Sequence, residues 1–137
     1  MQIAPLTDDA MDAVIDLWRA AGLTRPWNDP EADLRRALAG PASTVLAGIE
    51  DGALGATAMV GHDSHRGWIS YLAVREDARR RGHGAAMVAA CEAWLRDRGV
   101  PKLNLMVRVD NAAAHAFYDG LGYGRDDVVV RARRLDG

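Results

Sequence analysis

Three consecutive arginines precede two closely spaced glycines in the segment Arg79-Arg80-Arg81-Gly82-His83-Gly84-Ala85. We expect this segment to join a buried strand, Trp68–Val74, to a helix that starts at Gly84. A helix N-terminus disfavours cations but offers free N–H groups to an anion. Gly82 and Gly84 would let the backbone approach such a ligand closely. The pattern indicates a phosphate site, although an arginine-rich solvated loop shaped by its glycines would have the same sequence.

A second informative segment is Asn111-x-x-Ala114-x-x-Phe117-Tyr118, followed by Leu121-Gly122-Tyr123. It comes after an expected strand and opens an expected helix. The arginine segment alone is not specific. It lacks the Gly-Lys-Ser/Thr of a Walker loop and the third glycine of the dinucleotide fingerprint. The second segment is therefore needed before a function can be inferred.

Together the two segments resemble the GNAT superfamily of acetyl-CoA-dependent N-acetyltransferases. Arg79-x-x-Gly82-x-Gly84 is similar to the family's Arg/Gln-x-x-Gly-x-Gly/Ala pyrophosphate loop, and the segment from Asn111 is similar to its second half. The order and separation of the two also fit the family. Within it, residues 23–31 and 61–67 look like the short bacterial YpeA-type subgroup.

The resemblance implies a role for each matching residue. The backbone of Leu72, Ala73 and Val74 would pair with the pantetheine arm, and the Val74 N–H would stabilise the oxyanion. Tyr118 would protonate the departing thiolate, unless it is only a packed aromatic. The other implied cofactor contacts are Asn111 to the pantetheine, and the amides of Arg79, Arg80, Arg81, Gly82, His83, Gly84 and Ala85 to the pyrophosphate.

One part of the family pattern is missing, because many relatives carry a glutamate on the strand that here reads Trp68–Val74. That glutamate takes the amine's proton, and this strand has no carboxylate. The sequence leaves several replacements open: Asp29, His62, Asp63, His65 or a chain of water molecules.

Several polar and aromatic residues are candidates for lining the acceptor pocket: Trp27, Asn28, Asp29, His62, His65 and Tyr71. Simpler structural roles are open for them. Asn28 or Asp29 can cap a helix, Trp27 can pack against it, and residues 62–65 can form a solvated loop. No metal is expected, since no further ligand lies at metal-binding spacing. We expect no role for the side chains of His83 and His115.

Hydrophobic periodicity and turn residues predict an α/β fold with the order β-αα-βββ-α-β-α-β. The sheet would be mixed, with helices on both faces, in a single domain over residues 1–137. Asp51-Gly52 is typical of a type I′ hairpin turn. The expected strands are 3–4, 43–50, 54–60, 68–74, 102–107 and one or two within 123–135; the expected helices run from Thr7 to Gly22, from Pro30 to Gly40, over 84–98 and over 112–121.

Composition narrows the function classes. The chain has 137 residues, 49% of them hydrophobic and 26% charged, with a net charge of −2. This argues against a nucleic-acid partner, which usually requires a basic face. There is no apolar run that could span a membrane and no secretory pattern. The single cysteine, Cys91, is expected in the core, and a cytoplasmic location is the default.

The resemblance to the GNAT superfamily implies an enzyme that moves an acetyl group from acetyl-CoA, its co-substrate, to a primary amine by direct transfer in a ternary complex. The acceptor would be a small molecule or a protein terminus, and a homodimer is left open. The alternative is an acyl-CoA-binding or sensing module without turnover. The missing strand carboxylate favours the module, while Asn111 and Tyr118 favour the enzyme.

Overall fold

The computed structural model describes residues 1–136, and the chain forms two compact units that meet in sequence at Met106 and Val107. The first unit contains a β-sheet with helices, and the second contains one α-helix within its described part. No helix in the described chain is long and apolar enough to cross a membrane. The single domain expected over residues 1–137 stays a prediction.

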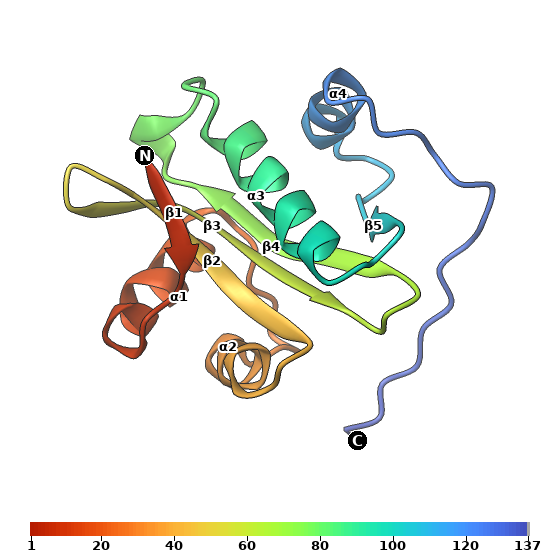
Figure 1. Ribbon diagram of the computed structural model, residues 1–137, viewed down its shortest axis with the longest axis horizontal. Coiled ribbons are helices and arrows are strands. Elements are labelled where there is room, and N and C mark those ends of the chain that lie inside the picture. The colour runs from red at the N-terminus through yellow and green to blue at the C-terminus, as the bar shows by residue number, and fades with distance from the viewer. Residues whose placement is uncertain (137) are drawn as a thin grey trace. The chain divides into compact units, whose positions relative to one another are not determined.

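The helices and strands follow the predicted order from β1 to α4 (Figure 1). The first unit comprises β1 (Gln2–Pro5), η1 (Asp8–Ala10), α1 (Met11–Ala20), α2 (Pro30–Ala39), β2 (Ser43–Glu50), β3 (Ala53–His62), β4 (Gly67–Val74), η2 (Glu76–Ala78), α3 (His83–Asp97) and β5 (Leu103–Leu105). The second unit contains α4 (Ala112–Gly120).

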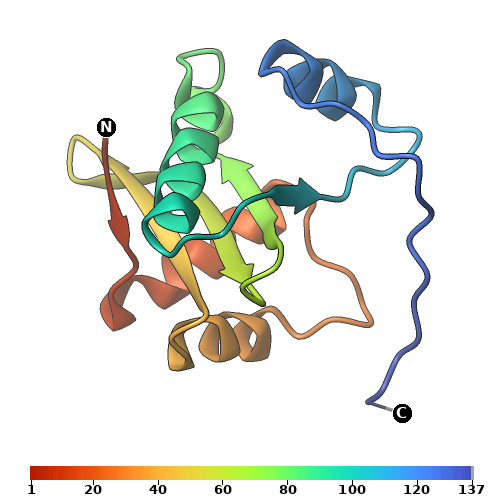
Figure 2. The ribbon, with the colours of Figure 1, turned by 45° about the vertical axis from the view of Figure 1, so that its right-hand side comes forward.

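The sheet has the strand order β1-β2-β3-β4-β5. Neighbouring strands are antiparallel except β4 and β5, which are parallel, so the sheet is mixed as predicted. Helices α1 and α2 cover one face of this sheet and α3 covers the other (Figures 1 and 2). The predicted fold class is confirmed.

Local sequence signals account for two of the connections. Asp29 caps α2 by accepting a hydrogen bond from the Ala32 N–H at 3.1 Å, and Pro30 occupies the first helical turn. Asp51 and Gly52 both have positive φ, 53° and 77°. That backbone is the one a type I′ turn requires, and it explains why an Asp-Gly pair joins β2 to β3.

Each face of the sheet has its own buried layer. Under α1 and α2 the layer includes Trp18 and Leu34, both fully buried. Under α3 it consists of Met87, Val88, Cys91 and Leu95. Burial raises the pKa of the Cys91 thiol to about 12, so Cys91 is a core residue, as expected, and not a nucleophile.

Two predicted strands differ from the structure. β5 covers only residues 103–105 of the expected 102–107, because it pairs with no more than Gly67–Ile69 of β4. Residues 123–136 form no strand, although one or two were predicted there. Their valines, Val128 to Val130, are at least 60% exposed. β-branched residues favour extended backbone, but a strand also needs a partner, and these residues pair with none.

Candidate active site

Strand β4 contains a bulge opposite the middle of β3. Thr57 pairs with Ala73 and Met59 pairs with Ser70, so the single residue between them on β3 faces two residues of β4, Tyr71 and Leu72. Tyr71 has φ = 50°, in the left-handed region that costs a non-glycine residue about 1–3 kcal/mol. The bulge turns the Tyr71 side chain toward α1 and α2.

Contacts from two other elements hold this strained residue. The Tyr71 ring stacks on Trp18 of α1, with ring centroids 3.9 Å apart and planes inclined by 14°. Trp18 Nε1 donates a hydrogen bond to Thr57 Oγ1 at 2.9 Å, and the same hydroxyl lies 3.4 Å from the Tyr71 carbonyl oxygen. Because Trp18 and Thr57 are fully buried, this cluster forms a rigid support for the bulge.

The end of β4 has an edge that pairs with no strand in the described chain. β5 pairs only as far as Ile69. Arg75 N donates to Gly55 O at 2.8 Å, so the polar groups of Arg75 point toward β3. Backbone polar groups alternate along a strand, and those of Val74 therefore point the other way. Arg79 Nε contacts the Val74 oxygen from that side at 3.4 Å. The Val74 N–H is thus directed toward the open edge.

The loop after β4 presents a helix N-terminus without a side-chain cap. Gly82 is the N-cap of α3 and has φ = 79°, and as a glycine it offers no side chain to accept a hydrogen bond from the helix start. Ala86 N donates to Gly82 O at 3.0 Å, which is the first bond of the helical ladder. The N–H groups of residues 83–85 come before it. This arrangement suits an anion with several oxygens, such as a pyrophosphate.

Glu50 at the end of β2 anchors this loop. Arg81 Nη1 lies 3.0 Å from Glu50 Oε1. His83 Nε2 lies 2.7 Å from Glu50 Oε2, though not in line for a hydrogen bond. The His83 side chain is buried, so it packs inward while its backbone N–H belongs to the helix start. The His83 side chain, for which no role was expected, is therefore buried beside Glu50.

On the face of the sheet that α1 and α2 cover, a cavity of about 450 Å³ lies between α2 and strands β3 and β4. Tyr71 Oη donates a hydrogen bond to Asp33 Oδ2 at 2.7 Å, and Arg36 Nη2 donates to Asp33 Oδ1 at 2.6 Å. Burial, with the hydrogen bond to Asp33, raises the pKa of Tyr71, which therefore stays protonated. The lining residues are Asp33, Arg36, Ala37, Ser43, Met59, Val60, Gly61, Trp68, Ser70 and Tyr71.

The outward N–H at the end of β4 and the uncapped start of α3 are thus joined by the segment that contains η2. Residues 11–123 match the model of the Acetyltransferase (GNAT) family. The chain belongs to this family. It is also 40% identical over 135 residues to an acetyltransferase of Yersinia enterocolitica, covering 98% of this chain and 96% of that protein.

Two solved structures of acetyltransferases are similar. The ribosomal-protein-S18-alanine N-acetyltransferase of Escherichia coli is 28% identical, with a TM-score of 0.76 over 88% of this chain and 76% of that one. An aminoglycoside N-acetyltransferase in complex with CoA is 15% identical, with a TM-score of 0.84 over 98% of this chain and 94% of that one. The second likeness shows the fold alone.

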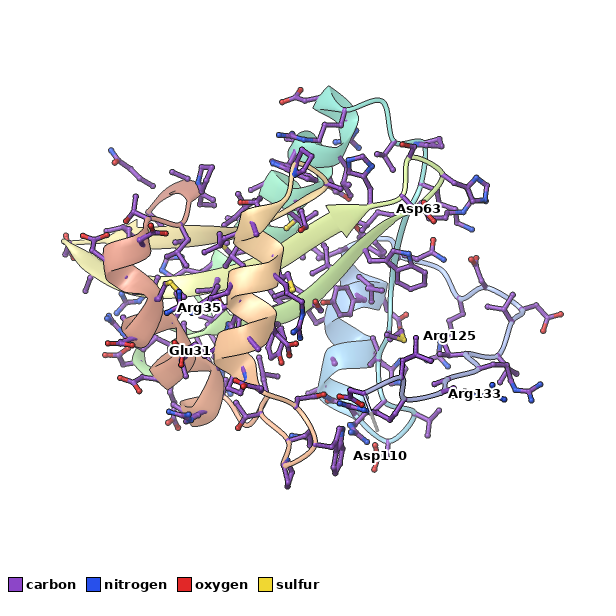
Figure 3. The ribbon with its side chains drawn as sticks, turned by 90° about the horizontal axis from the view of Figure 1, so that it is seen from below. Glu31, Arg35, Asp63, Asp110, Arg125 and Arg133 are labelled. Atoms are coloured by element: carbon purple, nitrogen blue, oxygen red, sulfur yellow. The ribbon has the colours of Figure 1, made fainter. Side chains whose placement is uncertain are left out.

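The loop between β3 and β4 of this GNAT protein holds its own backbone in place. Asp63 Oδ1 accepts from His65 N at 3.0 Å and from Arg66 N at 2.8 Å, and the bond from Arg66 is the main cause that lowers the Asp63 pKa (Figure 3). His62 Nδ1 accepts from Ser64 N at 2.9 Å. These are the bonds of a structured turn.

The same loop lies at the opposite end of β4 from Val74. His62 pairs with Gly67, the first residue of β4, and Val74 is the last. Seven residue steps of strand span roughly 23 Å. The fold therefore does not bring His62 or His65 near the Val74 N–H.

Three other predicted acceptor residues, Trp27, Asn28 and Asp29, lie between α1 and α2. Asp29 is occupied as the cap of α2, which was its structural alternative. Trp27 is 58% exposed in the connection before it, next to Asn28. Of the six predicted acceptor residues, only Tyr71 lines the cavity beneath α2.

In the second unit, Asn111 caps α4 by accepting from Ala114 N at 3.1 Å. The Tyr118 ring makes edge contacts with Phe117 and Tyr123, at centroid distances of 4.9 and 5.7 Å. His115 Nε2 lies 3.0 Å from the Arg108 oxygen, a partner that the sequence did not indicate. No group of three metal-binding side chains occurs in the described part of the chain.

Asp33 on α2 and Glu50 on β2 are two charged residues of the candidate site that the sequence analysis did not identify. Their partners are distant in sequence, 38 positions away for Tyr71 and 31 for Arg81. Asp33 sits in the first turn of α2, where an acid is common for dipole reasons alone. Asp33 lies four residues before the buried Ala37 and so on the same face of α2, and this spacing is the sequence signal that could have indicated it.

Proposed function

We propose that this protein transfers the acetyl group of acetyl-CoA to a primary amine by direct attack in a ternary complex. The observation that carries the proposal is that the outward Val74 N–H and the uncapped start of α3 lie close together in sequence. A thioester carbonyl needs the first feature and a pyrophosphate needs the second. Only one short loop separates them.

The first unit supplies the cofactor contacts. The edge formed by Leu72, Ala73 and Val74 would pair with the amide groups of pantetheine as an added strand. The Val74 N–H would hydrogen-bond the thioester oxygen as negative charge develops on it. The pyrophosphate would take the amides of Arg79, Arg80, Arg81, Gly82, His83, Gly84 and Ala85. With Arg81 paired to Glu50, Arg79 and Arg80 are the better side-chain donors.

The second unit supplies the proposed proton donor. As the neutral amine attacks the carbonyl carbon, the C–N bond forms and the C–S bond breaks. Tyr118 would give its proton to the departing thiolate and regain one from the amine nitrogen, so that CoA leaves as the thiol. Asn111 would contact the pantetheine through its amide N–H, because its side-chain oxygen caps α4.

An ammonium acceptor must lose one further proton before it attacks. Since β4 lacks a carboxylate, this proton would leave through water or through Asp29. Asp63 and the nearby histidines are poorly suited, because they lie at the far end of β4. Trp27, Asn28, His62 and His65 would contact only an extended acceptor.

The acceptor class is an amine on a small molecule or a protein terminus. The Escherichia coli relative is named for the alanine of a ribosomal protein, and the CoA complex is of an aminoglycoside acetyltransferase. The name of the Escherichia coli relative supports an amine acceptor for this chain without selecting a substrate.

The alternative is an acyl-CoA-binding module without turnover, favoured by the absence of a carboxylate on β4. One experiment separates the two. Calorimetry with acetyl-CoA tests binding, and thiol release with a panel of primary amines tests transfer. Binding with amine-dependent thiol release supports the enzyme, whereas binding without release from any amine supports the module. Absence of binding would refute both.

A further inference from the structure

We propose that the cavity between α2 and β4 binds an ammonium group that anchors the acceptor, apart from the amine that is acetylated, and that Asp33 is the residue that selects it. The inference rests on the proposed function, and it adds that the acceptor carries a positive charge that this protein recognises. Asp33 lies outside both sequence motifs that resemble the family. Its place follows from the bulge in β4, which turns Tyr71 onto its carboxylate.

The carboxylate is held in place but retains acceptor capacity. Tyr71 occupies one oxygen at 2.7 Å and Arg36 the other at 2.6 Å. An ionised carboxylate has about four lone-pair positions, so roughly two remain for a ligand. The Asp33 side chain is 26% exposed, which leaves it accessible from the cavity.

The charged neighbours of Asp33 define what the cavity can attract. Tyr71 faces it from β4 and stays protonated, so it adds no charge. Arg36 faces it from its own helix, but the Arg36 side chain is 71% exposed and such surface pairs are weak. Asp29 adds a further negative charge from the start of α2. A ligand cation can therefore replace Arg36 on the carboxylate.

The walls suit a cation that carries an apolar body. Trp68 is 41% exposed and lines the cavity together with Met59 and the Tyr71 ring. The face of an indole attracts cations, and its surface also packs against apolar groups. A volume of about 450 Å³ is within the usual range for a small-molecule site.

The position along β4 connects this cavity to the reaction. Tyr71 precedes Val74 by three residues, a distance of roughly 10 Å along an extended strand. An ammonium group held by Asp33 beside Tyr71 would therefore lie within one small-molecule length of a thioester bound at Val74, so it would anchor the acceptor while another amine of the same molecule attacks. Asp33 would bind and orient the acceptor, and Tyr71 would be a positioning residue that acts through Asp33.

The test measures binding by calorimetry with two matched probe pairs. The first is tyramine and its alcohol counterpart tyrosol; the second is trialanine amide and its N-acetylated form. In each pair only the first member carries an ammonium group. We expect the wild type to bind at least one ammonium probe about 10- to 100-fold more tightly than its neutral counterpart, as for a charge-assisted hydrogen bond.

Four variants make the test specific. Asp33→Asn should abolish the preference for ammonium. Tyr71→Phe keeps the ring stacked on Trp18 and should weaken binding several-fold. Arg36→Gln removes the competing cation and should tighten ammonium binding, which a purely structural Asp33 would not predict. Glu31→Gln removes a negative charge from the same helix, where Glu31 pairs with Arg35 at 2.9 Å, and should change nothing (Figure 3).

The outcomes separate this inference from the proposed function. If the wild type binds no probe, or binds each pair equally, or if Asp33→Asn keeps the preference, the ammonium site is refuted. Thiol release from acetyl-CoA with other amines would then still support the acetyltransferase. If acetyl-CoA does not bind, the proposed function fails by itself. Should Asp33→Asn not fold, the opposite effects expected of Tyr71→Phe and Arg36→Gln still decide the question.

Discussion

The two glycines of the phosphate loop should respond differently to substitution. Gly82 has φ = 79°, so any side chain there adds strain of about 1–2 kcal/mol to the folded state. Gly84 lies in the first turn of α3 and is not among the positive-φ glycines. Glycine is less favourable than other residues in a helix by up to about 1 kcal/mol, and valine recovers a few tenths of that.

From these values, Gly84→Val should leave the free energy of unfolding within about 0.5 kcal/mol of wild type. It should weaken acetyl-CoA binding at least about tenfold, or roughly 1.4 kcal/mol, because its side chain would occupy the space next to the helix-start amides. Gly82→Ala should lose about 1 kcal/mol of stability as well as affinity. The pair thus separates the role of the loop in binding from its role in folding.

The assays are urea denaturation for stability and calorimetry for the acetyl-CoA dissociation constant. Asp51→Asn serves as a stability control, since asparagine tolerates the positive φ of that turn and the turn is not part of the loop. Unchanged acetyl-CoA affinity in Gly84→Val would refute the assignment of the pyrophosphate to the start of α3.

Three further predictions follow from the same contacts. Acetyl-CoA at 100 times its dissociation constant should stabilise the fold by about 2.7 kcal/mol, seen as a thermal shift; no shift at millimolar acetyl-CoA would count against the family's cofactor for this chain. Tyr118→Phe should lower turnover by about 10²- to 10⁴-fold with little change in acetyl-CoA affinity, and wild-type turnover would return Tyr118 to a packing role. Thr57→Val should cost about 1–3 kcal/mol in urea denaturation, because it leaves the buried Trp18 Nε1 without its acceptor; a loss well below this range would show that the hydrogen bond does not support the bulge.

The sequence predicted most of the fold because the signals for it are local. Asp29-Pro30 and Asp51-Gly52 determine a helix start and a turn by their own backbone preferences. The strands expected within 123–135 failed for the opposite reason. Their β-branched residues give extended propensity, but pairing depends on a partner that no local pattern specifies.

The candidate site divides in the same way. The loop from Arg79 to Ala85 could be found in the sequence, because the residues proposed to bind the pyrophosphate are consecutive. The proposed acceptor side could not be found in the sequence, since it joins Asp33 to Tyr71 across 38 positions and depends on a bulge that no residue type marks. His62 and His65 were candidates because of their residue type, and the pairing of His62 with Gly67 puts them at the end of β4 opposite Val74.

The strain at Tyr71 should affect the proposed acceptor side of the site and not the start of α3. A left-handed tyrosine costs about 1–3 kcal/mol, and an aromatic stack returns about 0.5–1.5 kcal/mol. The bulge is therefore near energetic balance, and small changes in Trp18 or Thr57 should alter how Tyr71 presents its hydroxyl to Asp33. The start of α3 does not depend on that cluster, because Gly82 and Glu50 hold it. Substitutions beneath the bulge should accordingly change acceptor binding before they change acetyl-CoA binding.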